Sequence, residues 1–378
     1  MLDQTLAGIL ADADRYSGQT VRLSVKSAVV LTVLAALFAF APLPPTLVER
    51  AYSLGFFAAL QPRLTSLSNL TGIALLDVQI VLVVSGWVAL ALRDLIRSSR
   101  VHRWRTLARI GLRTLSWSAA AYLAFLVIWG FNYRRVRLVD RLDFGADRVT
   151  ADAALALAGQ AVEQMNTLHQ PAHEQGWSAP DVADPILADA LGGAVRDVGG
   201  VNRVVVGRPK RTLLDWYFRR AAVSGMTNPY FLETLIASDV LPFERPMVHA
   251  HEWSHLAGIA NEGEANFVAW IACVRSTPSH RYSAWLALYS DLLPSIARAD
   301  RTALVARVGP GPREDLRTIR DRYLRNVSPA VSTVGWRLYD SYLKANRVES
   351  GTASYAEVVR IVLGVRFTGT WMPQLRSQ

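Results

Sequence analysis

Three apolar runs in the first third of the chain constrain its fold more than any other feature. They cover residues 27–44, 71–92 and 115–131, and the middle run contains one acid, Asp77. A helix needs ~20 apolar residues to cross a hydrocarbon core of ~30 Å, and each run approaches this length. The shorter first and third runs are also compatible with buried core helices. All three runs lie in the first third of the chain and are flanked by Arg and Lys. We therefore predict three transmembrane helices.

The composition of the chain agrees with a membrane protein. Apolar residues make up 51% of the chain and charged residues only 19%. This balance excludes a disordered chain, which combines low hydrophobicity with high net charge. The single cysteine, Cys273, excludes an intrachain disulfide and a cysteine-rich zinc module.

The positive charge of the chain is concentrated between the second and third runs. Residues 93–113 contain seven arginines and one acid, and so hold +6 of the net charge of +10. Short loops rich in Lys and Arg stay in the cytoplasm. We therefore predict a basic cytoplasmic loop that binds anionic lipid of the bilayer and no nucleic acid. Residues 1–26 then lie in the cytoplasm as well, and the membrane domain covers residues 27–136.

The rest of the chain, residues 137–378, is predicted to lie outside the cytoplasm. A cleaved signal peptide, suggested by Ala39-Phe40-Ala41, is an alternative for the first run and leaves this domain on the same side. The domain is long enough to bury its own core. Helices mixed with a few short strands predict an α+β fold. We expect a strand at 201–206, a turn-rich stretch at 224–229, and helices near 151–168, 212–220, 281–293, 313–324, 333–346 and 355–363.

One pentapeptide in this domain carries the chemistry. His251-Glu252-Trp253-Ser254-His255 is an H-E-x-x-H pattern. On a helix, residues i and i+4 share a face, so both imidazoles can bind one metal ion. Glu252 is then placed beside the open position of the metal, where it can act as general base on a water molecule.

A catalytic zinc site needs a third protein ligand and one open position. Gly258 can end the helix three residues after His255, as glycine commonly does. The chain can then present Glu262 or Glu264 at the start of a second helix, predicted over residues 262–275. Acids at a helix N-terminus also suit the helix dipole without any metal, so both carboxylates have a second explanation.

The sequence after the pentapeptide resembles that of known zinc peptidases. Glu262-x-x-Ala265-Asn266 is similar to the E-x-x-A-D/N signature with which gluzincin-type peptidases supply their glutamate ligand. The resemblance implies that Glu262 binds the zinc and that Asn266 supports a ligand. The interval from His255 to Glu262 is shorter than in thermolysin-like enzymes, which leaves Glu264 as the alternative.

Nearly the whole chain resembles a bacterial family of three-pass membrane proteins with an outward-facing zinc-metallopeptidase domain. The matching stretches are 48–53, 129–133, 224–233, 241–246 and 339–346, besides the zinc region itself. The resemblance implies a zincin-like domain with a small sheet, anchored in the bacterial inner membrane.

We therefore expect a zinc metallopeptidase that cleaves a peptide or protein substrate. His251, His255 and Glu262 are the predicted metal ligands, Glu252 is the base, and Tyr342 is the first candidate for oxyanion stabilisation. The 201–206 or 224–231 stretch can present a strand edge to an extended substrate. The alternative function is a zinc-binding membrane sensor or assembly protein without turnover. A zinc helix inside the bilayer is excluded because residues 247–266 are too polar.

Overall fold

The computed structural model describes residues 25–346 and 357–376 and divides the chain into two compact units. Unit 1 contains residues up to Leu43 and Val78–Trp129, and unit 2 contains Pro44–Asp77 and Gly130–Gln378. Most of the predicted N-terminal cytoplasmic segment, residues 1–24, lies outside the described residues. The fold is mostly helical with a small sheet, as the predicted α+β class requires.

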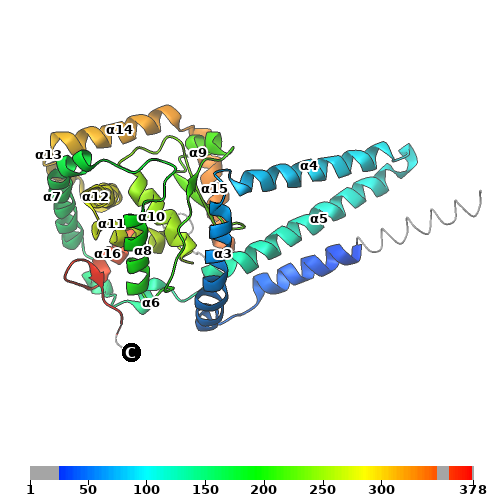
Figure 1. Ribbon diagram of the computed structural model, residues 1–378, viewed down its shortest axis with the longest axis horizontal. Coiled ribbons are helices and arrows are strands. Elements are labelled where there is room, and N and C mark those ends of the chain that lie inside the picture. The colour runs from blue at the N-terminus through cyan, green and yellow to red at the C-terminus, as the bar shows by residue number, and fades with distance from the viewer. Residues whose placement is uncertain (1–24, 347–356, 377–378) are drawn as a thin grey trace, which may run out of the picture. The chain divides into compact units, whose positions relative to one another are not determined.

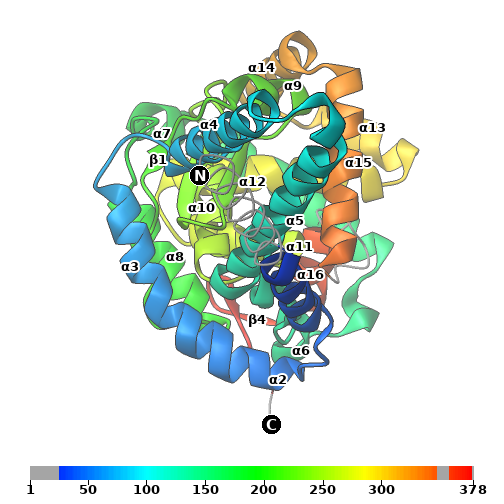
Figure 2. The ribbon, with the colours of Figure 1, turned by 90° about the vertical axis from the view of Figure 1, so that its right-hand side faces the viewer.

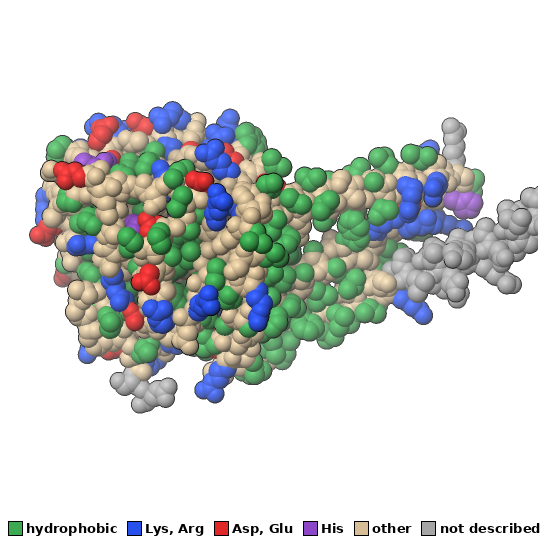
Figure 3. Space-filling model, in the orientation of Figure 1, with side chains coloured by type: hydrophobic (Ala, Val, Ile, Leu, Met, Phe, Trp, Pro, Cys, Tyr) green, Lys and Arg blue, Asp and Glu red, His purple; other side chains and the backbone are tan. Residues whose placement is uncertain are grey.

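Unit 1 contains two long apolar helices, α4 (Leu75–Ile96, whose first turn belongs to unit 2) and α5 (Arg103–Ile128), joined through the short η2 (Arg100–His102). Both are long and apolar enough to cross a membrane. Hydrophobic side chains line the visible face of this pair, and Lys and Arg gather at the end where η2 joins the two helices (Figure 3). Only 6% of the most apolar part of α4 is buried against the rest of the protein, so its side chains are available to lipid.

The structure corrects two expectations about this part of the chain. Within the described residues, the helix of the first apolar run covers Val25–Phe40 and ends before the predicted boundary at residue 44. Its described part reaches spanning length together with the helical segment Pro45–Asn69, across a break rich in proline. The predicted basic loop 93–113 is mainly helical, because α4 and α5 continue into it from either side. Arg113 of α5 donates to Asp94 of α4 at 2.5 Å, and Trp87 donates to Thr114 at 2.9 Å. These contacts hold the two helices together.

Unit 2 is a helical domain around one central helix, α11 (Figures 1 and 2). Its remaining elements are α2 (Pro45–Leu47), η1 (Val48–Phe56), α3 (Phe57–Asn69), η3 (Gly130–Arg134), α6 (Leu138–Arg141), η4 (Ala146–Arg148), α7 (Ala151–Gln175), α8 (Pro185–Asp197), β1 (Pro209–Lys210), α9 (Asp215–Ala221), β2 (Gly225–Asn228), β3 (Glu233–Ile236), α10 (Arg245–Leu256), α12 (Pro278–Leu292), η5 (Leu293–Ser295), α13 (Arg298–Ala306), α14 (Pro310–Asn326), α15 (Pro329–Ala345), α16 (Glu357–Gly364), β4 (Phe367–Thr368) and β5 (Met372–Pro373). Helix α11 (Glu262–Val274) packs against α8, α10, α12 and α16. Almost all of its residues are buried, so its polar first turn faces the protein interior.

The small sheet has the order β1-β3-β2. Strand β3 pairs parallel with β1 and antiparallel with β2, with Gly225 opposite Ile236. Strand β2 is therefore an edge strand, and it packs against α10. A separate hairpin joins β4 and β5.

The predicted strand at 201–206 is wrong. The backbone of this segment makes its hydrogen bonds with side chains of α3 instead of with another strand. Gln61 donates to the Val205 carbonyl at 2.6 Å and accepts from its amide at 3.2 Å, while Asn69 donates to the Val206 carbonyl. A β-branched sequence thus becomes an extended segment whose polar groups are satisfied outside any sheet.

A fully buried ion pair fixes the sheet to α3 and to the first residues of α4. Lys210 Nζ lies 2.9 Å from Glu233 Oε2, and neither side chain is exposed. Glu233 also accepts from Asn228 and from the amides of Leu75 and Leu76, so it caps α4. Burial raises the pKa of Glu233, but these donors more than offset it, and the pKa lies below its usual value.

Candidate metal centre

Helix α10 places the two histidines of the pentapeptide side by side. Pro246 lies in the first turn of the helix, where its missing N–H removes no helical bond. His251 and His255 lie one turn apart, with ring centroids 4.7 Å apart and their Nε2 atoms separated by 3.1 Å. Both rings therefore present the same atom toward one point.

A tight turn after α10 returns the chain to this point. Gly258 has a φ of +80°, and a Cβ there would lie 3.1 Å from Phe57 and Asn132 atoms, so any other residue would be strained. The carbonyl of Gly258 accepts from Arg135 at 2.7 Å, and Arg135 forms a bidentate pair with buried Glu49. This ion pair fixes the turn and hence the start of α11.

Helix α11 begins at the carboxylate that completes the group. Asn261 caps it by accepting from the amide of Glu264 at 3.0 Å. Glu262 Oε2 lies 3.1 Å from His251 Nε2 and 3.3 Å from His255 Nε2. Glu264 faces elsewhere and accepts from the amide of Leu138 at 2.5 Å. Of the two acids that the sequence left open, the structure brings Glu262 to the histidine pair.

Hydrogen bonds on the far sides of the imidazoles set their tautomers. His251 Nδ1 lies 2.7 Å from Asn266 Oδ1, and His255 Nδ1 lies 2.7 Å from the Ile259 carbonyl. Oxygen accepts in both contacts, so each Nδ1 carries a hydrogen, and the neutral form of each ring has its lone pair on Nε2, where a metal can bind. Such outer contacts orient the ligands of protein metal sites.

The spacing of the three atoms fits a zinc ion. Zinc binds N and O at about 2.0–2.2 Å with tetrahedral geometry, which separates neighbouring ligand atoms by about 3.3 Å. The observed separations of 3.1–3.3 Å match this value. Glu262 Oε2 is also buried, and it faces the Nε2 atoms of both histidines. The donor set of two imidazoles and one carboxylate is one that catalytic zinc sites use.

The charges of the group are strongly coupled. Burial lowers the pKa of His255, but the carboxylate of Glu262 more than compensates and raises it to about 9. Burial acts to raise the pKa of Glu262, yet the histidines hold it well below its usual value. The carboxylate of Glu262 is therefore ionised, and its charge favours a cation between the two imidazoles.

Glu252 lies beside this group with few polar partners. Its side chain is buried, and Thr227 Oγ1 of β2 lies 2.9 Å from its Oε2. A Cβ at Gly225 would come within 2.6 Å of Oε1, so the edge strand approaches the carboxylate closely. Burial raises the pKa of Glu252 above its usual value. A carboxylate with a raised pKa is suited to proton transfer near neutral pH.

Two tyrosines of α15 lie near the group. The hydroxyl of Tyr339 donates to Glu262 Oε1, whereas the Tyr342 hydroxyl lies 3.5 Å from that of Tyr133. The two rings stack at 5.8 Å. Tyr342 was predicted from the sequence, whereas the contact of Tyr339 with Glu262 was not, although the i, i+3 spacing places both tyrosines on one helix face.

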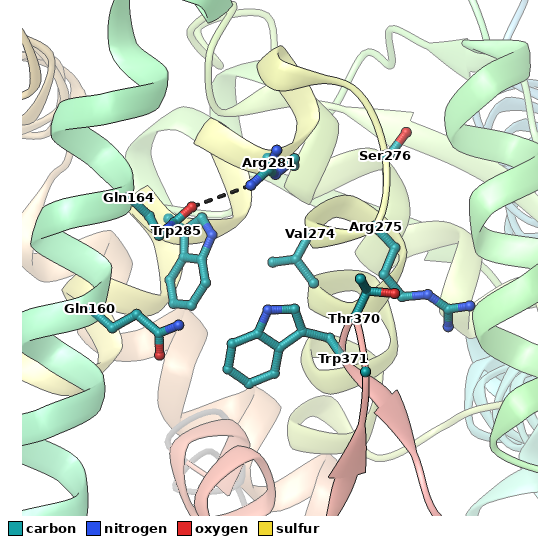
Figure 4. A pocket seen from close by; sticks show the side chains of 10 residues that line it. Gln160, Gln164, Val274, Arg275, Ser276, Arg281, Trp285, Thr370 and Trp371 are labelled. Carbon is teal, nitrogen blue, oxygen red and sulfur yellow. Dashed lines mark hydrogen bonds between the residues drawn. The ribbon is translucent and has the colours of Figure 1, made fainter.

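A separate cavity of about 600 Å³ lies at the other end of α11 (Figure 4). Trp285 and Trp371 line it together with Gln164 and Arg281, which are hydrogen-bonded. It contains none of the predicted site residues.

Residues 52–363 match the sequence profile of a family described as a protein of unknown function, DUF3810. The chain belongs to this family. The DUF3810 match includes α4, α5 and the whole histidine–glutamate group. No curated protein and no solved structure matched the chain.

Proposed function

We propose that this DUF3810 member is a membrane-anchored zinc metallopeptidase. The observation that carries the proposal is the convergence of His251 Nε2, His255 Nε2 and Glu262 Oε2 beside the buried carboxylate of Glu252. A structural zinc site has no need of a base and usually closes its fourth position with a protein ligand. Glu252 thus favours turnover over a zinc-binding sensor or assembly role. By this proposal unit 2 is a zincin-like domain.

The residues would divide the reaction as follows. A zinc ion in this group would polarise a peptide carbonyl and lower the pKa of a water molecule. Glu252 takes a proton from the attacking water as its oxygen bonds to the carbonyl carbon. It then delivers this proton to the amine nitrogen as the C–N bond breaks. Tyr342 remains the proposed oxyanion donor, while Tyr339, through Glu262, is a positioning residue.

The edge strand β2 is the proposed substrate platform. One side of β2 pairs with β3, and Gly225 at its start contacts the base. An extended peptide added to the other side would run past Glu252. Of the two stretches considered from the sequence, only 224–231 contains a strand.

Cleavage of a peptide library by detergent-purified protein tests the function directly. We expect zinc-dependent cleavage that a chelator abolishes and added zinc restores. Binding of zinc without cleavage of any peptide, together with a Glu252→Gln variant that keeps cellular function, would favour the sensor role.

We further propose a multi-pass topology in a bacterial inner membrane, with unit 2 outside the cytoplasm. The basic residues where α4 and α5 meet support a cytoplasmic location for that end. Alkaline phosphatase fused after Gln378 should be active, whereas phosphatase fused after His102 should be inactive. The reverse pattern of activities would place unit 2 in the cytoplasm.

Zinc affinity should rise with pH. His255, whose pKa is about 9, must lose its proton before its Nε2 can bind zinc. Zinc then displaces this proton, so affinity increases about tenfold per pH unit as the pH rises toward about 9 and levels off above it. Competition with a chelator of known affinity measures this slope. An affinity that stays constant over this range would contradict the assignment of His255.

A further inference from the structure

A second group of two histidines and a carboxylate lies on elements that the first group does not use. His169 and His173 occupy successive turns of α7, and Asp315 lies on α14. Their ligand atoms all lie within 4.8 Å of one another. We propose that these three residues bind a late first-row divalent transition metal ion, at a site separate from His251, His255 and Glu262.

The spacing of the donors supports this site. His173 Nε2 lies 2.9 Å from Asp315 Oδ2, and His169 Nε2 lies 3.5 Å from the same oxygen. These distances bracket the roughly 3.3 Å expected between neighbouring ligands of one tetrahedral ion. The two imidazoles are related by i, i+4 on one helix, as in α10, with ring centroids 4.2 Å apart. Two imidazoles and one carboxylate suit Zn²⁺ and its transition-metal neighbours.

The surroundings of the group resemble the outer layer of a metal site. The hydroxyl of Tyr282 donates to Asp315 Oδ2 at 2.5 Å and fixes the carboxylate. Trp177 lies edge-on to His173 at 4.9 Å, so an aromatic wall closes one side. Gly311 leaves room for the His169 ring, because a Cβ there would collide with it. Hydrogen bonds to the ligands strengthen metal binding, and an apolar wall limits the access of solvent to the site.

The group is open enough for an ion to enter. The side chains of His169 and His173 are 25% and 36% exposed, whereas that of Asp315 is 9% exposed. Three protein ligands on one side leave a position for water. Because the ligands come from α7 and α14, the bound ion would tie these two helices together, and it would stabilise the folded state by linkage.

Zinc stoichiometry of the full chain in detergent, after removal of all metal and dialysis against Zn²⁺, tests the proposal. We expect about two zinc ions per wild-type chain and one in a His169→Ala/His173→Ala variant. A His251→Ala/His255→Ala variant should also retain one, and its melting temperature should rise with added Zn²⁺. Gln170→Ala, an exposed change on the same turn of α7, should behave as wild type.

The possible outcomes separate this site from the proposed active site. Equal zinc content in wild type and the His169→Ala/His173→Ala variant would overturn the second site. The second site would also be overturned if Zn²⁺ left the melting temperature of the His251→Ala/His255→Ala variant unchanged. The contacts of His169 and His173 with Asp315 would then only hold α7 and α14 together. If the His169→Ala/His173→Ala variant lost zinc while the His251→Ala/His255→Ala variant kept the wild-type content, the result would support the second site. It would count against zinc binding by His251, His255 and Glu262.

Discussion

We expect Glu252→Gln to lower peptide cleavage by about 10²–10⁴-fold, the range that a positioned general base contributes. Glutamine keeps the shape of the side chain and can retain the contact with Thr227, but it cannot accept the proton of the attacking water. Zinc content should remain that of wild type, because Glu252 is not among the three converging ligands. The measurement is the initial rate on the best peptide found by library cleavage.

Glu163→Gln is the matched control, since Glu163 is an exposed glutamate of α7 away from the group. Its rate should equal that of wild type. If Glu252→Gln also cleaved at the wild-type rate, another residue would have to supply the base. In the wild type, the acid limb of the rate profile should lie above pH 4.5, because burial raises the pKa of Glu252.

The second large effect concerns stability. Lys210→Met should lower the free energy of unfolding by about 3–5 kcal/mol, because it leaves the buried charge of Glu233 without its cation. Pulse proteolysis in urea, on protein in detergent, measures this loss. A Lys210→Met/Glu233→Gln double variant should recover part of it, since the uncompensated charge is removed.

Lys344→Met is the matched control, because this lysine is 55% exposed and pairs with Asp340 on its own helix. Exposed i, i+4 pairs contribute about 0.3–0.5 kcal/mol, so the variant should unfold almost as wild type does. Equal stability of Lys210→Met and Lys344→Met would show that the Lys210–Glu233 pair does not secure the sheet. The pKa of Glu233 is lowered, so its contribution is present above about pH 4.5 and is lost as the pH falls.

The residues of the candidate metal centre could be predicted where local spacing determines geometry. An i, i+4 pair shares a helix face, and a glycine commonly ends a helix, so that the chain can turn back. The structure accordingly brings together His251, His255 and Glu262, with Asn266 on His251. The choice between Glu262 and Glu264 needed the structure, because both lie in the first turn of α11.

Contacts between distant segments could not be predicted from the sequence. Glu49 and Arg135 are separated by 86 positions, and Tyr339 reaches Glu262 across 77. No periodicity connects such pairs. The wrong prediction of a strand at 201–206 has the same origin. The sequence there is β-branched, but its backbone carbonyls bond to the side chains of Gln61 and Asn69, which are distant in the sequence. The contacts between β2 and α10, which bring Thr227 and Gly225 to Glu252, could not be predicted from the sequence either.

Zinc analysis by mass spectrometry of detergent-purified variants tests the central claim most directly. At a free zinc concentration just high enough to fill the wild-type sites, His255→Ala and Glu262→Gln should each contain one zinc ion fewer per chain than wild type. Glu264→Gln should keep the wild-type content, because Glu264 faces the amide of Leu138. Unchanged zinc in His255→Ala, or loss in Glu264→Gln but not in Glu262→Gln, would contradict a zinc centre built from His251, His255 and Glu262.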